Sequence, residues 1–341
     1  MARISGIVTV ERDGLHNGFT DILFWQGAYW ISFRKSQGHI SPDGETFISV
    51  SGDGEQWRNA CRIKIPGDNR DPRLIAVSEN RMALIISTWM DGYTSDSLGF
   101  QRKRLLSFIM FSEDGHNWTE PRQTLPENRW LWKIRRFNDR YYAANYGLTE
   151  GATWSSRRIS FEFMASDDLV NWEKVSDLGE GDFVPIETDM AFREDGEVWL
   201  VSRNDIKTSG MVDSHFSSAL PPYTNWETVN LGTVIHSPEL VTIDRNVYLA
   251  GRCDMVKDSS LPWPYPREWS MALWKLGRGA VEPILYFPAC GDCSYPGMLV
   301  DPNGNLCISY YSQHAYGMGV IPSTSGFEPA DIFFAKIDLS E

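Results

Sequence analysis

The sequence of 341 residues lacks several features that define common classes of protein. It contains no run of 18 or more apolar residues, so we expect no transmembrane helix. Acidic residues outnumber basic ones, and the formal net charge of −13 argues against partners such as nucleic acid or an anionic membrane surface. The segment Met1–Gly6 lacks the apolar core of a signal peptide. We therefore expect a cytoplasmic protein, or a secreted or periplasmic one whose signal segment precedes this sequence.

Cysteine and histidine are also scarce, with 5 and 6 residues respectively. An odd number of scattered cysteines does not indicate a disulfide framework. Cys290 and Cys293 form a single Cys-x-x-Cys pair, without the second pair that a structural zinc site needs. The histidines show no spacing typical of metal ligands. The sequence thus predicts neither a metal site nor a cofactor.

Long amphipathic helices are absent as well, and short segments that alternate apolar and polar residues take their place. Aromatic residues are abundant, with 14 Trp, 13 Tyr and 17 Phe. Such residues favour strands, and exposed ones suit stacking on sugar rings. These features predict an all-β fold.

One short pattern recurs along the chain, and its tryptophans are 61, 54 and 54 residues apart. A Ser or Asp side chain caps the backbone, Asp-Gly forms a tight turn in the first two copies, and Trp begins the next strand. The interval is that of a propeller blade rather than of a short solenoid repeat. The copies are Ser51–Trp57, Ser112–Trp118, Ser166–Trp172 and, more weakly, Pro222–Trp226.

With this repeat as a ruler, the chain divides into six units of up to four strands, and the last unit is one strand short. The apolar segment Gly6–Glu11 has no unit of its own and is expected to pair with the last unit, which would close the ring. The prediction is a six-bladed β-propeller that forms a single domain over residues 1–341. A two-sheet sandwich is the competing fold, but it does not require a missing final strand.

In a propeller, the starts of the innermost strands and the ends of the second strands meet at one mouth of the central channel. Polar and aromatic residues at these places are the candidate site. At the strand starts they are Asp21, Asp71, Arg73, Trp132, Lys133, Glu187, Asp189, Glu239 and Tyr295. At the ends of the second strands they are Arg34, His39, Trp89, Arg203, Arg252 and Tyr311.

Three arginines, Arg34, Arg203 and Arg252, fall at equivalent positions of different units. Several arginines in one pocket recognise a carboxylate, sulfate or phosphate through paired hydrogen bonds. A tyrosine beside a carboxylate can act as a nucleophile, because the carboxylate takes its proton. A neutral phenol approaches an anionic sugar with less repulsion than a carboxylate nucleophile would.

The Ser-x-Asp-Gly-x-x-Trp turns resemble the Asp-boxes of the sialidase superfamily, whose fold is a six-bladed propeller. The segments around Glu187 and Arg203, around Glu239 and Arg252, and around Tyr295 are similar to sialidase catalytic segments. The resemblance implies that Tyr295 is the nucleophile and Glu187 its base. It also implies that Arg203 and Arg252 bind an anionic group.

The first innermost strand departs from the sialidase pattern, because Phe19-Thr-Asp21 stands where sialidases have Arg-Ile-Pro. The loop after Arg34 holds His39 and no Asp before Asp43, so the proton donor is expected to be His39 or Asp71. Trp89 and Trp132 are expected to stack on the sugar. Arg73, Lys133, Asp189, Glu239 and Tyr311 complete the predicted substrate-binding set.

Three functions are compatible with these residues. The first is an exo-acting, sialidase-like glycoside hydrolase on an acidic sugar, sialic-acid-like or uronic, or on a related sugar. The second is a polysaccharide lyase that acts on a uronate, with Tyr295 or His39 removing the α-proton. The third is a non-catalytic, carbohydrate-binding propeller.

Overall fold

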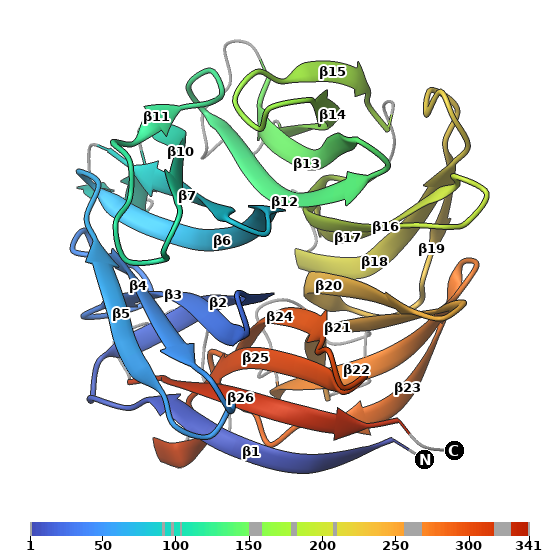
Figure 1. The fold of residues 1–341 in the computed structure, drawn as a ribbon. Helices are drawn as coiled ribbons and strands as arrows, with labels where there is room; N and C mark the ends of the chain where they lie inside the picture. The colour runs from blue at the N-terminus through green and yellow to red at the C-terminus, as the bar shows by residue number, and fades with distance from the viewer. Residues whose placement is uncertain are drawn as a thin grey trace.

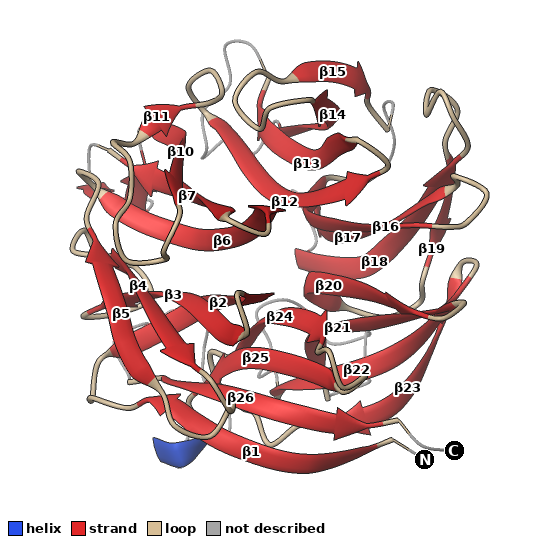
Figure 2. Ribbon diagram, viewed as in Figure 1, coloured by secondary structure: helices blue, strands red, loops and turns tan. Residues whose placement is uncertain are grey.

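A computed structural model describes residues 2–90, 93–96, 99–102, 104–149, 159–178, 183–206, 210–255, 268–316 and 329–339. Six antiparallel sheets of four strands are arranged around a central axis (Figure 1). Almost every regular element is a strand (Figure 2), and the one short 3-10 segment in the described ranges is His314–Tyr316. No helix in the described part of the chain is long and apolar enough to cross a membrane. The predicted six-bladed β-propeller is confirmed.

The first three blades follow the chain in order, each from its innermost strand outwards. Blade 1 is β2 (His16–Trp25), β3 (Ala28–Ser36), β4 (Glu45–Ser51) and β5 (Arg58–Ile63). Blade 2 is β6 (Asp68–Ser78), β7 (Arg81–Trp89), β10 (Leu105–Ser112) and β11 (Arg122–Gln123), with the separate hairpin β8 (Tyr93–Asp96) and β9 (Gly99–Arg102) between β7 and β10. Blade 3 is β12 (Arg129–Phe137), β13 (Arg140–Leu148), β14 (Ile159–Ser166) and β15 (Glu173–Ser176).

The remaining blades continue this order until the chain returns to its beginning. Blade 4 is β16 (Pro185–Phe192), β17 (Val198–Ile206), β18 (Gly210–Ala219) and β19 (Glu227–Asn230). Blade 5 is β20 (Ile235–Ile243), β21 (Asn246–Asp254), β22 (Trp269–Gly277) and β23 (Ala280–Tyr286). Blade 6 is β24 (Ser294–Val300), β25 (Leu306–Ser312), β26 (Asp331–Asp338) and β1 (Arg3–Glu11).

The ring closes as the sequence predicts. Strand β1 pairs antiparallel with β26, so that Ile7 lies opposite Ala335. The two termini consequently lie side by side (Figure 1). Strand β1 covers the edge of β26 and becomes the outermost strand of blade 6, the one that the last unit of the sequence lacks.

The core is divided among the spaces between neighbouring blades rather than gathered in one centre. Between blades 1 and 2, for example, Trp30 and Ile48 pack with Leu74 and Met82. The alternation of apolar residues along each strand is what supplies both faces of these layers. The packing fixes the blades around the axis and so positions their strand ends.

The recurring Ser-x-Asp pattern forms turns between the third and fourth strands of blades 1 to 3, and we call these the Ser-Asp turns. In the first, Asp53 Oδ1 accepts hydrogen bonds from the backbone N–H groups of Glu55 and Gln56, at 2.8 and 2.9 Å. The next residue takes a positive φ, which is +78° at Gly54 and +67° at Leu169, a leucine in the glycine position. Each turn is therefore held by its own side chains.

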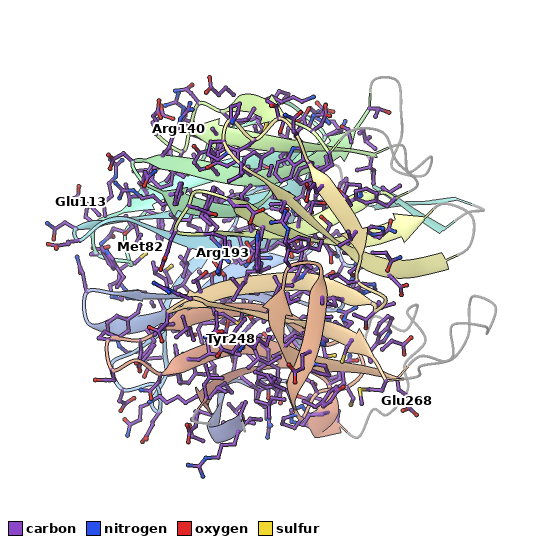
Figure 3. The ribbon with its side chains drawn as sticks, turned by 90° about the vertical axis from the view of Figure 1, so that its right-hand side faces the viewer. Met82, Glu113, Arg140, Arg193, Tyr248 and Glu268 are labelled. Carbon is purple, nitrogen blue, oxygen red and sulfur yellow. The ribbon has the colours of Figure 1, made fainter. Side chains whose placement is uncertain are left out.

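The Ser-Asp turns and the candidate site lie at opposite ends of the ring. In the side view of Figure 3, Glu113 of the second turn lies at one end and Glu268, which precedes β22, lies at the other. First and third strands of a blade run in the same direction, so the innermost strands also begin at the Glu268 end.

Candidate active site

Each innermost strand has a break in its pairing register close to its start. The breaks occur between Gly18 and Asp21, Arg70 and Arg73, Leu131 and Lys133, Ile186 and Asp189, His236 and Glu239, and Ser294 and Gly297. A bulge of this kind redirects a side chain and is common beside active sites. We call the first residue skipped at each break a bulge residue, and the six are Phe19, Asp71, Trp132, Glu187, Ser237 and Tyr295.

Most bulge residues have a backbone conformation that side chains rarely adopt. The φ angles of Asp71, Glu187 and Tyr295 are +47°, +45° and +44°, and those of Phe19 and Ser237 are +60° and +47°. Such a conformation costs about 1–3 kcal/mol per non-glycine residue, and it is found mainly at functional sites. Five of the six blades have this unfavourable conformation at the same position of the innermost strand.

The bulge residues of different blades meet around Tyr295. The Tyr295 hydroxyl donates to Glu187 Oε1 at 2.6 Å, and the Ser237 N–H donates to Glu187 Oε2 at 3.0 Å. The rings of Phe19 and Trp132 lie 5.0 and 6.1 Å from the Tyr295 ring, both in edge contact. Residues that are 108 positions apart in the chain, Glu187 and Tyr295, are thus brought into hydrogen-bond contact.

Two arginines flank the Tyr295 phenol. Arg203 Nη1 donates to Glu187 Oε1 at 2.8 Å and lies 3.5 Å from the Tyr295 hydroxyl. The Arg252 guanidinium carbon lies 5.2 Å from the centre of the Tyr295 ring. Burial, together with the charge of Glu187, raises the pKa of Tyr295 well above its usual value. The phenol is therefore neutral at pH 7, and Glu187 is placed to accept its proton.

Asp71 lies within electrostatic reach of this pair. Burial raises the pKa of Asp71 to about 6, against the opposing charges of Arg73 and Arg70. Its Oδ1 atom is buried and has no hydrogen-bond partner in the described part of the chain. A buried carboxyl with a raised pKa and an unused oxygen can carry and donate a proton.

Four predicted substrate-binding residues form instead a buried ionic network with two further residues. Lys133 forms ion pairs with Asp21, at 3.4 Å, and with Glu239. Arg135 lies 2.5 Å from Asp189 Oδ2 and 2.9 Å from Glu239 Oε1. This axial ion cluster consists of Asp21, Arg73, Lys133, Arg135, Asp189 and Glu239.

The axial ion cluster pairs its charges internally. Although burial opposes the change, Lys133 and Arg135 hold the pKa of Glu239 below its usual range. Arg73 donates to the Thr20 carbonyl at 2.8 Å and lies over the Trp132 ring at 5.0 Å. Arg73, Lys133, Asp189 and Glu239 thus have partners of opposite charge inside the cluster, and their role in binding substrate stays a prediction.

Arg34 is completely buried and does not join the other two arginines at Tyr295. Its guanidinium donates to Asp68 at 2.7 Å and to the carbonyl oxygens of Gly38 and Ser41 at 2.9 and 3.2 Å. Asp68 lies on blade 2, so Arg34 fastens the loop after β3 and joins blades 1 and 2. Of the three predicted anion-binding arginines, Arg203 and Arg252 are the two that contact Tyr295, and the role of Arg34 stays a prediction.

The two predicted stacking tryptophans are also buried, with 1% of Trp89 and 2% of Trp132 exposed. Trp89 packs edge-on against Trp130 at 5.7 Å, and Trp132 contacts Tyr295 as described above. Both rings pack against other aromatic side chains of the protein, and their stacking on a sugar stays a prediction.

His39, Arg252 and Tyr311 meet at a residue that the sequence reading did not select, Asp292. Its Oδ2 lies 2.5 Å from His39 Nδ1, and its Oδ1 accepts hydrogen bonds from Tyr311 at 2.7 Å and from Arg252 at 3.0 Å. Burial lowers the pKa of His39 to about 4, against the opposing charge of Asp292. Asp292 stands inside the Cys290–Cys293 pair, and that position three residues before Tyr295 was the available signal.

Comparison with solved structures shows the same fold in several proteins. A protein of unknown function from Dyadobacter fermentans matches with a TM-score of 0.76 and 15% identity, over 99% of this chain and 99% of that one. A GH93 α-L-arabinofuranosidase of Fusarium graminearum, solved with arabinobiose, matches with a TM-score of 0.64 and 12% identity, over 98% of each chain.

Trypanosoma rangeli sialidase, solved with sialic acid, matches with a TM-score of 0.61 and 13% identity. The match covers 98% of this chain but 57% of the sialidase chain. No protein-family model and no curated protein matches the sequence. The chain therefore has the sialidase-like propeller fold, and its structural neighbours include glycoside hydrolases.

Proposed function

We propose that the protein is a glycoside hydrolase in which Tyr295 is the nucleophile and Glu187 is its base. The observation that carries the proposal is the hydrogen bond of 2.6 Å between the Tyr295 hydroxyl and Glu187 Oε1. A neutral phenol needs a partner that removes its proton as it attacks, and a carboxylate at this distance meets the need. The exo-acting mode predicted from the sequence is retained in the proposal.

The first step of the proposed reaction forms a bond between Tyr295 Oη and the anomeric carbon of the sugar, while the phenolic proton passes to Glu187. The glycosidic bond breaks, and its oxygen leaves with a proton from Asp71. In the second step, Asp71 removes a proton from water, whose oxygen bonds to the anomeric carbon while the bond from that carbon to Tyr295 Oη breaks. Glu187 returns its proton to Tyr295, so the enzyme is regenerated and the configuration is retained.

Asp71 is preferred to His39 as the proton donor. Its pKa of about 6 leaves about a tenth of the carboxyl groups protonated at pH 7. The pKa of His39, at about 4, leaves that ring neutral at pH 7, and its Nδ1 is committed to Asp292 at 2.5 Å. Two carboxyl groups with different environments, Glu187 and Asp71, thus take the roles of base and acid.

The proposed substrate carries an anionic group close to the reacting carbon. Arg203 and Arg252 flank the phenol, and 17% and 11% of their side chains are exposed. A substrate carboxylate would replace part of the hydrogen bonding that Arg203 now has with Glu187 and that Arg252 now has with Asp292. A neutral sugar is the alternative, since each arginine already has a carboxylate partner in the protein.

A screen of aryl glycosides tests both points. It comprises sialic acid, its deaminated analogue, uronic acids and a neutral arabinofuranoside, each measured with the parent protein and with Tyr295→Phe. We expect release of the aryl group from an anionic glycoside and none with the variant. Product absorbance typical of an unsaturated uronate would indicate a lyase, and binding without turnover in both proteins would indicate a carbohydrate-binding propeller.

A further inference from the structure

Three side chains beside the proposed catalytic pair take no part in its chemistry. His16 lies on β2 and His39 follows β3, both in blade 1, whereas Asp292 precedes β24 of blade 6. The ring of Phe19 contacts both His39, at 5.2 Å, and Tyr295, at 5.0 Å. The group therefore spans the seam between the first and last blades.

The donor atoms of the three side chains converge. Asp292 Oδ2 lies 2.8 Å from His16 Nε2 and 2.5 Å from His39 Nδ1, and the three atoms all lie within 4.8 Å of one another. His16 is completely buried, and its other ring nitrogen, Nδ1, has no hydrogen-bond partner among the described residues. Within the described ranges, this is the one group of histidine, cysteine and acidic side chains with such a spacing.

The carboxylate is oriented by its surroundings. Asp292 Oδ1 accepts hydrogen bonds from the Tyr311 hydroxyl at 2.7 Å and from Arg252 at 3.0 Å, which leaves Oδ2 directed at the two imidazoles. The Asp292 backbone N–H donates to Gln313 Oε1 at 2.7 Å. Hydrogen bonds that hold one oxygen of a carboxylate while the other faces a ligand site are characteristic of metal centres.

We propose that His16, His39 and Asp292 bind one divalent transition-metal ion, of which zinc is the best match. Two imidazole nitrogens and one carboxylate oxygen are donors that suit zinc, whereas calcium and magnesium prefer sites made of oxygen alone. Bonds of about 2.0–2.2 Å to the three donors require only a slight outward movement of the side chains. A fourth position remains for water or a sugar hydroxyl.

The proposed ion would join blade 1 to blade 6. It supplements the contacts already present at the seam, such as the hydrogen bond of 3.1 Å from the Asn17 N–H to the Ala330 carbonyl. Since the three donors come together only in the folded ring, the ion binds the folded state and raises the melting temperature as its concentration rises. This inference goes beyond the proposed function and does not depend on it.

The test uses the full chain, freed of metal with a chelator and then dialysed. Zinc chloride alone is added, and binding is measured by calorimetry, by elemental analysis after gel filtration and by the melting temperature. We expect one zinc ion per chain and a melting temperature that increases with zinc concentration. Calcium chloride should give neither effect.

Four variants locate the ion. Loss of a group that only orients a metal ligand typically weakens metal binding by about 10–100-fold. His39→Ala removes a ligand itself, so it should weaken zinc binding by more than this. Tyr311→Phe, which removes the hydrogen bond to Asp292 and no donor atom, should weaken it within that range. His314→Ala and Cys290→Ser are the controls, because they alter a half-buried histidine outside the group and the neighbouring Cys-x-x-Cys pair. Both controls should bind zinc as the parent does.

Four results would overturn the proposal: no zinc bound by the parent, equal affinity in the parent and His39→Ala, loss of zinc in Cys290→Ser, or unchanged affinity in Tyr311→Phe. The circular dichroism spectrum of each variant shows whether it is folded. If His39→Ala does not fold, Tyr311→Phe still decides the question, because an unchanged affinity would exclude a metal held by Asp292. Turnover by the metal-free parent would leave the proposed function intact.

Discussion

The two ends of the ring carry two kinds of repeated local structure, and they differ in what is repeated. At one end, the Ser-Asp turns repeat their residues, and each turn satisfies its own backbone. The Ser166 hydroxyl accepts the Leu169 N–H at 3.0 Å, and Asp168 accepts the N–H groups of Val170 and Asn171 at 2.9 and 2.7 Å. These contacts span only two or three residues.

At the other end, the bulges repeat their geometry but not their residues. Asp71, Glu187 and Tyr295 share one backbone conformation in three blades, yet they differ in charge and size. Their contacts join distant parts of the chain, such as Tyr295 with Glu187. A turn built for stability can use the same residues in every blade, whereas a site needs a different chemical group from each.

The largest effect is expected from removing one hydroxyl at the bulge end. Tyr295→Phe should reduce kcat by at least about 10⁴-fold, or about 5.4 kcal/mol, because the nucleophile is lost. Its melting temperature should stay close to that of the parent. Steady-state kinetics on the best aryl glycoside, with calorimetry of binding, measures the change.

Tyr310→Phe is the matched control for Tyr295→Phe. Tyr310 is the neighbour of Tyr311, is completely buried, and has a hydroxyl without a hydrogen-bond partner in the described part of the chain. We expect unchanged turnover. Equal activity of both variants would show that the Tyr295 hydroxyl is not the nucleophile.

The axial ion cluster beneath the site provides the next largest effect, on stability. Lys133→Met removes the positive charge that neutralises the buried carboxylates of Asp21 and Glu239. It should destabilise the fold by about 3–5 kcal/mol. Urea denaturation is the measurement. Lys174→Met removes an ion pair of 2.8 Å with Asp177 on the surface, and it should cost less than about 1 kcal/mol. Similar losses in the two variants would mean that the cluster is not a structural element.

Asp71→Asn should lower kcat/KM by about 10²-fold, because the proposed proton donor is lost. In the parent, kcat/KM should fall as pH rises through about 6, the pKa of Asp71, and the variant should lack this decline. A pH profile of both proteins measures it. A decline at the same pH in the variant would assign the proton donor to another group.

Stability gives an independent check on Asp71. Its folded pKa of about 6 exceeds the reference value of 3.8, so the folded state binds more protons between these values than the unfolded state does. The stability contributed by Asp71 is therefore greatest at low pH and decreases as pH rises from 3.8 to about 6. Asp71→Asn should gain stability relative to the parent over that interval.

The smallest effect is expected at the Ser-Asp end. Asp168→Ala removes two hydrogen bonds to backbone N–H groups and should destabilise the fold by about 1 kcal/mol while leaving kcat unchanged. Those N–H groups lower the Asp168 pKa to about 2, so its contribution is present above the ordinary pKa and is lost as pH falls through about 2. Thermal unfolding at several pH values measures the loss of stability and its dependence on pH. Asp167→Ala, at the exposed neighbour, should have no comparable effect.

Much of the fold follows from the sequence, but the starts of four of the six innermost strands do not. The alternation of apolar and polar residues is regular only from about four residues inside these strands, whereas the structure begins them at His16, Asp68, Pro185 and Ile235. The physical reason is the bulge. It adds residues to one strand and interrupts the alternation, so the pattern is regular only beyond it.

The candidate site was predictable only in part for a related reason. The sequence reading selected Tyr295, Glu187 and Asp71, which the structure brings together, and missed Asp292. It also selected Arg34 and Lys133 as ligand-binding residues, although both are buried in ion pairs. Position along a strand predicts which end of the ring a residue occupies, but it does not predict which opposite charge already neutralises it.

The sequence by itself determined the local and periodic features, namely the Ser-Asp turns, the strand alternation and the number of blades, because these depend on residues close together in the chain. The tertiary structure alone decided which charges pair and which remain for chemistry. Asp292, His16 and His39 are separated by up to 276 positions, and no local rule relates them. Their meeting depends on ring closure, which brings the first and last blades into contact.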